Sequence, residues 1–174
     1  MQEVPTTLAP IWRGAASLVL ASRSESRRAL LSAAGLDAEV VAPGVDERAL
    51  EERHLGRGGS LESLAAELAC AKALAVSAER LDAYCIGADQ TLTFEGRVLH
   101  KASDFAEAAQ TLATLAGKTH RLTSAFCVAR ARQALVVHRD HADVRMRALD
   151  PGEISRYLTK PARVCARDRQ PKEV

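Results

Sequence analysis

The stretch "CIGADQTLTFEG", residues 85–96, decides how this chain is expected to fold. Its first residues are short and apolar, its second part alternates threonine with larger apolar residues, and Glu95-Gly96 supplies a turn. This pattern predicts a strand that runs into a β-hairpin. Asp89 stands inside it as a single carboxylate, which can act on water as a general base or bind a hard cation. The competing interpretation is a turn-forming aspartate.

The segments on either side predict the rest of the architecture. Strands and helices alternate early in the sequence, whereas hairpin-like strand pairs dominate later, which favours an α/β fold with a mixed β-sheet flanked by helices. The expected strands are 17–22, 38–47 (broken at Pro43-Gly44), 119–130 and 134–149, and residues 83–101 are expected to form a strand and then a hairpin that turns at Glu95-Gly96. The expected helices begin after Ser22 or Ser24, Ser60, Asp104 and Asp150, with 53–60 as a flexible loop.

Composition and charge exclude several classes of protein. The 174 residues are 47% hydrophobic and 26% charged with a net charge of +2, which is typical of one ordinary globular domain. Only 3% of the residues are aromatic and no basic helix face emerges, so we expect no nucleic-acid binding. No run approaches the roughly 20 apolar residues of a membrane helix, and the first sixteen residues lack a signal-peptide pattern. Four widely spaced cysteines are typical of free thiols, and together these features predict a cytoplasmic protein with no membrane contact.

The segment "LASRSESRR", residues 20–28, has the features of an anion site. A strand that enters a helix through serines presents free backbone N–H groups, which favour a bound phosphate. Arg27 and Arg28 lie in the first helical turn, where the helix dipole disfavours cations unless an anion is bound. An ordinary capped helix with exposed arginines is the alternative interpretation.

Three further charged residues stand in places that call for an explanation. Lys72 falls between Ala65 and Leu68 on the apolar face of the helix expected at 61–80, so its ammonium must either extend to solvent or meet an anion. Glu47 follows a strand and a turn, where it could face a metal ion or solvent. Lys101 precedes a helix start where a phosphate could lie.

In order and spacing these stretches resemble the Maf family of nucleoside triphosphate pyrophosphatases. The matching segments are "LVLASRSESRRALLSAAG", "VAPGVDE", "LACAKA", "IGADQTLTFEGRVLHKASD", "LAGKTHRLTSAFCV" and "ADVRMRALDPGEISRYL", which cover residues 17–158. The resemblance implies an elongated mixed sheet with two lobes and a central cleft. It also implies hydrolysis of a nucleoside triphosphate to the monophosphate and pyrophosphate with Mg²⁺ or Mn²⁺.

The same resemblance implies roles for individual residues. Asp89 corresponds to the catalytic proton acceptor, and Glu47 and Asp89 are the expected metal ligands. The expected substrate-binding residues are Ser22, Ser26, Arg27, Arg28, Lys72, Gln90 and Lys101. The sequence GADQ, with Gln90 directly after Asp89, resembles the branch of the family that acts on 7-methyl-GTP.

The two ends of the chain depart from this pattern. We expect residues 1–16 to be a loose segment, 17–158 a single Maf-like domain and 159–174 an irregular tail. The tail is polar and basic and lacks the segment with which the family usually continues, which indicates a truncation or frame shift. The alternative function is therefore an inactive family member that binds a nucleotide or a partner in a regulatory role. A homodimer is a further open prediction.

Overall fold

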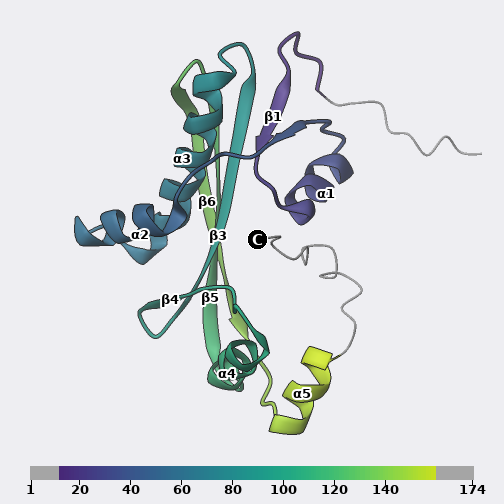
Figure 1. Cartoon of the computed structure of the whole chain (residues 1–174), viewed down its shortest axis with the longest axis vertical. Helices are drawn as coiled ribbons and strands as arrows, with labels where there is room; N and C mark the ends of the chain where they lie inside the picture. Colours follow the sequence, from purple (N-terminus) through teal and green to yellow (C-terminus); the bar gives the residue numbers. More distant parts are fainter. Residues whose placement is uncertain (1–11, 160–174) are drawn as a thin grey trace, which may run out of the picture.

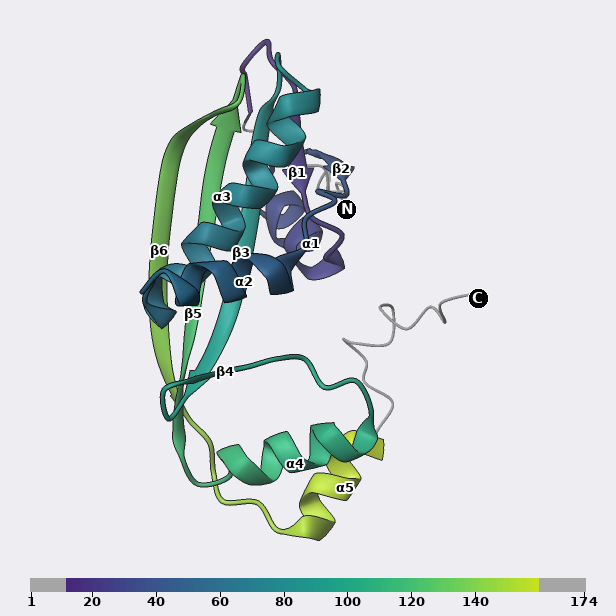
Figure 2. The same ribbon diagram turned by 60° about the vertical axis from the view of Figure 1, so that its left-hand side comes forward.

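The computed structural model describes residues 12–159, which form one elongated mixed sheet with helices at both ends (Figures 1 and 2). The elements are β1 (Leu18–Ala21), α1 (Glu25–Ala33), β2 (Glu39–Val41), α2 (Glu47–Gly56), α3 (Leu61–Glu79), β3 (Tyr84–Phe94), β4 (Arg97–Leu99), α4 (Phe105–Leu115), β5 (Thr119–Arg130), β6 (Gln133–Arg145) and α5 (Pro151–Thr159). The strand order is β2-β1-β3-β5-β6, with β4 paired to β3. The predicted α/β fold with a mixed sheet is confirmed.

Strand β3 is the axis of the sheet because it extends well beyond its parallel neighbour. It pairs in parallel with β1, which ends at Ala21 opposite Gly87, and antiparallel with β5 along most of its length. Asp89 is therefore two residues past the end of β1. At that point the chain leaves the sheet and turns into α1, so the sheet has an open step beside Asp89.

Helix α3 packs on β3 and β5 through small side chains. Ala65, Ala69 and Ala73 of the helix form a fully buried cluster with Ala125, Cys127 and Ala129 of β5. Gly87 of β3 lies directly beneath the helix, where an added Cβ would overlap Ala69 O and come within 2.6 Å of Ala73 N. Small residues on both surfaces thus bring the helix unusually close to the strand.

The opposite face and the outer edge of the sheet are more open. Strand β6 lies at the edge (Figure 2), and Leu135, Val136 and Val137 in it are about half exposed. Helix α1 has no buried residue, and Leu30 in it is 71% exposed. The tightly packed core of the described residues therefore lies on the α3 side of the sheet.

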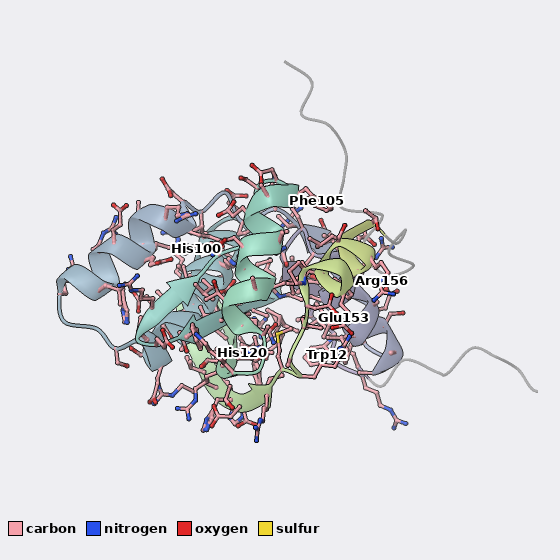
Figure 3. The ribbon with its side chains drawn as sticks, turned by 90° about the horizontal axis from the view of Figure 1, so that it is seen from below. Trp12, His100, Phe105, His120, Glu153 and Arg156 are labelled. Carbon is pink, nitrogen blue, oxygen red and sulfur yellow. The ribbon has the colours of Figure 1, made fainter. Side chains whose placement is uncertain are left out.

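Helices α4 and α5 lie against each other at the far end of the long strands, as the view from below shows (Figure 3). Each begins with a capping aspartate, as predicted. Asp150 Oδ1 accepts from Glu153 N, and the Glu153 carboxylate accepts from Asp150 N in return. Asp104 caps α4 by accepting from Glu107 N. The predicted hairpin turn at Glu95-Gly96 is also confirmed, with both residues at positive φ.

Two details of the prediction are wrong. The strand expected at 38–47 spans only Glu39–Val41, and the loop expected at 53–60 is helical as far as Gly56. Asp46 caps α2 by accepting from Ala49 N. This helix is easily missed in the sequence because it has few apolar residues and none of its side chains is buried, so no apolar periodicity marks it.

The cysteines in the described part of the chain are free thiols, as predicted. Cys85 and Cys127 are buried, and burial raises the pKa of Cys85. Burial, together with the neighbouring Cys70, raises the pKa of Cys127 to about 12, so this thiol stays protonated at neutral pH. Across residues 12–159 no helix combines the length and hydropathy needed to cross a bilayer. The predictions for residues 1–11 and for the tail from 160, with Cys165, lie outside the described residues.

We expect Gly87→Ala to lower the free energy of unfolding by about 1–3 kcal/mol or more, because the new methyl group meets the backbone of α3. Urea denaturation followed by circular dichroism measures this loss. Gly56→Ala is the matched control, because a Cβ at Gly56 meets no atom within 4 Å. Equal stabilities of the two variants would show that the helix does not need this close approach.

Candidate functional site

The turn between β1 and α1 presents hydroxyl groups and an arginine at the open step of the sheet. Ser22 Oγ accepts from Ser24 N at 3.2 Å and from Arg27 Nη1 at 3.3 Å. Ser24 is the N-cap of α1, and its Oγ lies 3.5 Å from Arg27 N. These bonds hold the Arg27 guanidinium over the start of its own helix, where the free backbone N–H groups also favour an anion.

Lys72 is the buried cation at the centre of the site. Lys72 is 3% exposed, and its Nζ donates to Asp89 Oδ1 at 2.5 Å. Glu47 Oε1 lies 2.8 Å from the same nitrogen. Of the two outcomes open from the sequence, the ammonium meets anions rather than extending to solvent. The anions are two carboxylates of this chain, one from β3 and one from the start of α2.

Asp89 is the most buried carboxylate of the site, at 8% exposure. Arg27 Nη2 is 3.6 Å from Asp89 Oδ1, so this oxygen lies between an ammonium and a guanidinium. The charged contacts that Asp89 makes with described residues all fall on Oδ1. The geometry leaves Oδ2 as the oxygen that can accept a hydrogen bond from water or a ligand.

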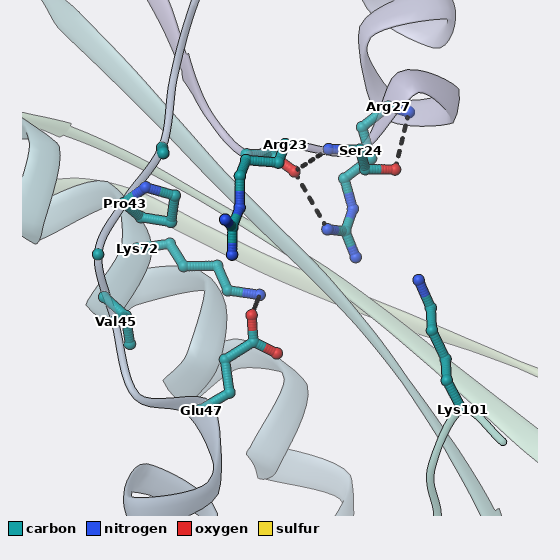
Figure 4. A pocket seen from close by; sticks show the side chains of 11 residues that line it. Arg23, Ser24, Arg27, Pro43, Val45, Glu47, Lys72 and Lys101 are labelled. Carbon is teal, nitrogen blue, oxygen red and sulfur yellow. Dashed lines mark hydrogen bonds and ion pairs between the residues drawn. The ribbon is translucent and has the colours of Figure 1, made fainter. Parts of the chain in front are cut away.

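A pocket of about 550 Å³ opens above these residues (Figure 4). Its lining combines four cations, two serines and one carboxylate: Arg23, Arg27, Lys72, Lys101, Ser22, Ser24 and Glu47, with Ala42, Pro43, Gly44 and Val45 forming one wall. Lys101 belongs to the connection between β4 and α4, whereas the other cations belong to the α1–α3 end of the molecule. Residues from both ends of the sheet therefore line one pocket, as expected for a cleft between two lobes.

The structure brings together six of the residues singled out in the sequence. They are Ser22, Arg27, Glu47, Lys72 and Lys101 in the pocket lining, with Asp89 bonded to Lys72 beside it. Because the cations outnumber the carboxylates, the pocket as a whole is suited to a multiply charged anion.

Three expected substrate-binding residues lie outside the pocket lining. Gln90 follows Asp89 on a strand, so its side chain points to the opposite face of the sheet, where its Nε2 donates to Ser124 Oγ at 2.8 Å. Arg28 is exposed, and Ser26 is exposed with its Oγ 2.9 Å from Ser24 Oγ. Their roles in substrate binding stay predictions that this geometry does not support.

The sequence reasoning also missed two parts of the pocket. Arg23 lines it, although a lone arginine between two serines carried no separate signal. Residues 42–45 also form a wall of the pocket, with Gly44 at φ +61°, whereas the sequence pattern predicts only the acid after this turn, Glu47, to face the site. The signal available in the sequence was the Pro-Gly pair itself, because such a pair marks a turn directly before Glu47.

The donor set fits a divalent cation only in part. Glu47 and Asp89 offer hard carboxylate oxygens, and both lie within 2.8 Å of a single nitrogen, so they are close enough to share one ion after a small shift. In the described part of the chain, no three His, Cys, Asp or Glu side chains come together to hold a metal ion. Mg²⁺ is commonly held by one or two carboxylates and substrate phosphates, and the residues here suit that arrangement.

Comparison with known proteins gives a consistent result. Residues 17–166 match the family model described as Maf-like protein. A protein of Mesorhizobium japonicum named 7-methyl-GTP pyrophosphatase is 45% identical over 141 residues, which are 81% of this chain and 71% of the relative. A protein of the same name from Rhizobium meliloti is 44% identical over 82% of this chain and 72% of its own length. A nucleoside triphosphate pyrophosphatase of Nitrobacter hamburgensis is 40% identical over 85% of this chain and 72% of its own length.

We expect the stability of the site to depend on Lys72 and Arg27 together. Removing the sole partner of a buried charge costs about 3–5 kcal/mol, but Lys72→Met leaves Asp89 its contact with Arg27. The single variants Lys72→Met and Arg27→Met should therefore each lose less than that. The double variant should lose more than the two single losses combined, because the carboxylate then has neither cation.

Urea denaturation of the wild type, both single variants and the double variant measures this coupling. Arg28→Met is the matched control for Arg27→Met, because Arg28 is the next residue in the sequence and is an exposed arginine. Strictly additive losses would contradict the shared role.

Proposed function

The chain belongs to the Maf-like family, and from this premise we propose that it hydrolyses a nucleoside triphosphate to the monophosphate and pyrophosphate. The observation that carries the proposal is the basic pocket lined by Lys72 and Arg27, both of which contact Asp89 beside it. The family match covers every residue of this site. The names of the relatives point to the same reaction.

The pocket cations support binding of the triphosphate. Arg23 and Arg27 approach from the β1–α1 side and Lys101 from the β4–α4 side, so negative charge between them meets cations from two directions (Figure 4). Arginine forks and lysine ammonium groups both form charge-assisted hydrogen bonds with phosphate oxygens. Serine hydroxyls and the first N–H groups of α1 add neutral donors.

We assign Asp89 the role of general base, which orients the attacking water and accepts its proton. Before a substrate binds, Asp89 Oδ1 contacts Lys72 and Arg27, and Asp89 Oδ2 is the oxygen that accepts a hydrogen bond from a water molecule placed against the α-phosphorus. The water oxygen forms a bond to the α-phosphorus, the bond from that phosphorus to the α–β bridging oxygen breaks, and pyrophosphate leaves. The proton released by the water passes to Asp89 Oδ2. Positioning and charge neutralisation dominate such a reaction.

Glu47 and Asp89 are the residues that would hold Mg²⁺ or Mn²⁺ together with phosphate oxygens. When bound, a divalent cation neutralises charge on the phosphates and polarises the reacting phosphoryl group. We further propose 7-methyl-GTP as the substrate to test first, because the two relatives from Mesorhizobium and Rhizobium carry that name. The cytoplasm and a homodimer remain our proposals for location and assembly.

A panel of 7-methyl-GTP, GTP, dTTP and UTP with Mg²⁺ or Mn²⁺ tests the proposal, with pyrophosphate release as the readout. Hydrolysis in ¹⁸O-labelled water should place the label in the nucleoside monophosphate, because attack is at the α-phosphorus. Asp89→Asn should lower kcat by about 10²-fold or more, the usual contribution of a general base. Asp82→Asn, at an exposed acid in the turn before β3, is the matched control and should leave kcat unchanged.

Saturable nucleotide binding without turnover of any substrate would instead support the regulatory, inactive alternative. Turnover that Asp89→Asn leaves intact would remove Asp89 from the mechanism. Label found in pyrophosphate would show attack at another phosphorus.

Lys101→Met should raise KM about ten- to hundredfold with kcat nearly unchanged, since an interaction with a charged group contributes about 1.5–3 kcal/mol. The reason is that Lys101 contributes charge to the pocket, whereas the ion pairs of Asp89 within residues 12–159 are made by Lys72 and Arg27. Steady-state kinetics with the best substrate of the panel measures both constants. Lys118→Met, at a lysine that lies over the Phe94 ring outside the pocket, is the control. A fall in kcat with KM constant would contradict a role in binding.

A further inference from the structure

We infer that Lys72 holds the position of a divalent cation between Glu47 and Asp89 and gives it up only when phosphates offer its ammonium other partners. The inference rests on the proposed function and specifies how the site is regulated. Its consequence is that the protein alone binds divalent cations weakly, and that a cation and a triphosphate enter the site together.

The first support is the position of the Lys72 ammonium. Its Nζ is 2.5 Å from Asp89 Oδ1 and 2.8 Å from Glu47 Oε1, so it bridges carboxylates from two different elements. A cation shared by these two carboxylates would have to lie in the same small region. Two positive charges this close together repel each other, most strongly near Asp89, which is 8% exposed, and less near Glu47, which is 56% exposed. The ammonium and the metal ion therefore exclude each other between the carboxylates.

The second support is that Lys72 has somewhere else to go. It lines the pocket as well as reaching the carboxylates, so its ammonium borders the space assigned to the phosphates (Figure 4). An ammonium has three N–H donors, and the contacts to Glu47 and Asp89 account for two of them. The flexible stem of lysine permits a shift of the ammonium toward phosphate oxygens while the helix stays in place.

The third support is the shortage of other metal ligands. Within residues 12–159 no third carboxylate, histidine or cysteine joins this pair. With only two protein ligands, both already paired with the Lys72 ammonium, a divalent cation gains little by binding to the protein alone. Phosphate oxygens change the balance because they add ligands for the metal and an anion for Lys72 at the same time.

Titration of each protein with Mn²⁺ in the absence of nucleotide tests this inference, with the electron paramagnetic resonance signal of free Mn²⁺ as the readout. Lys72→Met should bind Mn²⁺ at least about tenfold more tightly than the wild type, because one neighbouring like charge shifts an ionic equilibrium by about one to three powers of ten. Lys72→Gln, which keeps a polar side chain, should show the same direction and serves if the methionine variant unfolds. Circular dichroism checks the fold of both.

Lys101→Met is the matched control, because it removes a positive charge from the same pocket without touching either carboxylate. It should leave Mn²⁺ affinity within about twofold of the wild type, since an exposed charge is screened by salt. Adding Glu47→Gln to Lys72→Met should abolish the gain.

The outcomes divide cleanly. Tighter Mn²⁺ binding confined to the Lys72 variants, and lost with Glu47→Gln, supports the inference. Unchanged or weaker binding in folded Lys72 variants overturns it, and so does an equal gain in Lys101→Met. Because no nucleotide or turnover is involved, failure here leaves the hydrolase proposal standing, and an inactive wild type leaves this result intact.

Discussion

The buried ion pair between Lys72 and Asp89 is the interaction on which the rest of this structure depends. Taking two charges out of water is costly, and the cost is offset only where the partners meet with good geometry. That meeting requires α3 to lie close to β3, which the alanines of the helix and Gly87 of the strand make possible. It also requires β3 to run past the end of β1, so that Asp89 faces a gap instead of a neighbouring strand. The packing of α3 on β3 and the pairing of Lys72 with Asp89 thus both require the helix to lie close to the strand.

The same arrangement explains why the pocket suits phosphate. Its cations are held before any ligand arrives: Lys72 by two carboxylates and Arg27 by Ser22 and Asp89. A polyphosphate that enters meets an Arg27 guanidinium that is already oriented, and only the Lys72 ammonium has to shift toward it, which limits the cost of reorganisation. Lys101 reaches this space from the other end of the sheet, so binding spans both ends of the molecule.

Most of the fold and the centre of the site follow from local sequence patterns. Local residue patterns predicted the hairpin turn at Glu95-Gly96 and the helix caps Ser60 and Asp150, and the structure confirms them. They also marked Lys72 as a lysine on the apolar face of α3, where it is buried. Helix α2 gave no such signal because it buries no side chain. Gln90, Ser26 and Arg28 were expected at the site from the resemblance to the family, but strand alternation and helix geometry place them outside the pocket lining, and their role stays a prediction. Arg23 enters the pocket only through the three-dimensional course of its turn.

The edge strand β6 has a consequence for how the protein behaves in concentrated solution. Among the strands of residues 12–159, β6 pairs only with β5, and an unpaired strand edge is a template on which another chain can add. Leu135, Val136 and Val137 are about half exposed and make the first half of β6 apolar. Arg139, Asp140 and Asp143 counter this, because burying these charged side chains against another chain is unfavourable. Self-association of the protein should therefore depend on the few charged side chains of β6 far more than on the nearly balanced total charge of the chain.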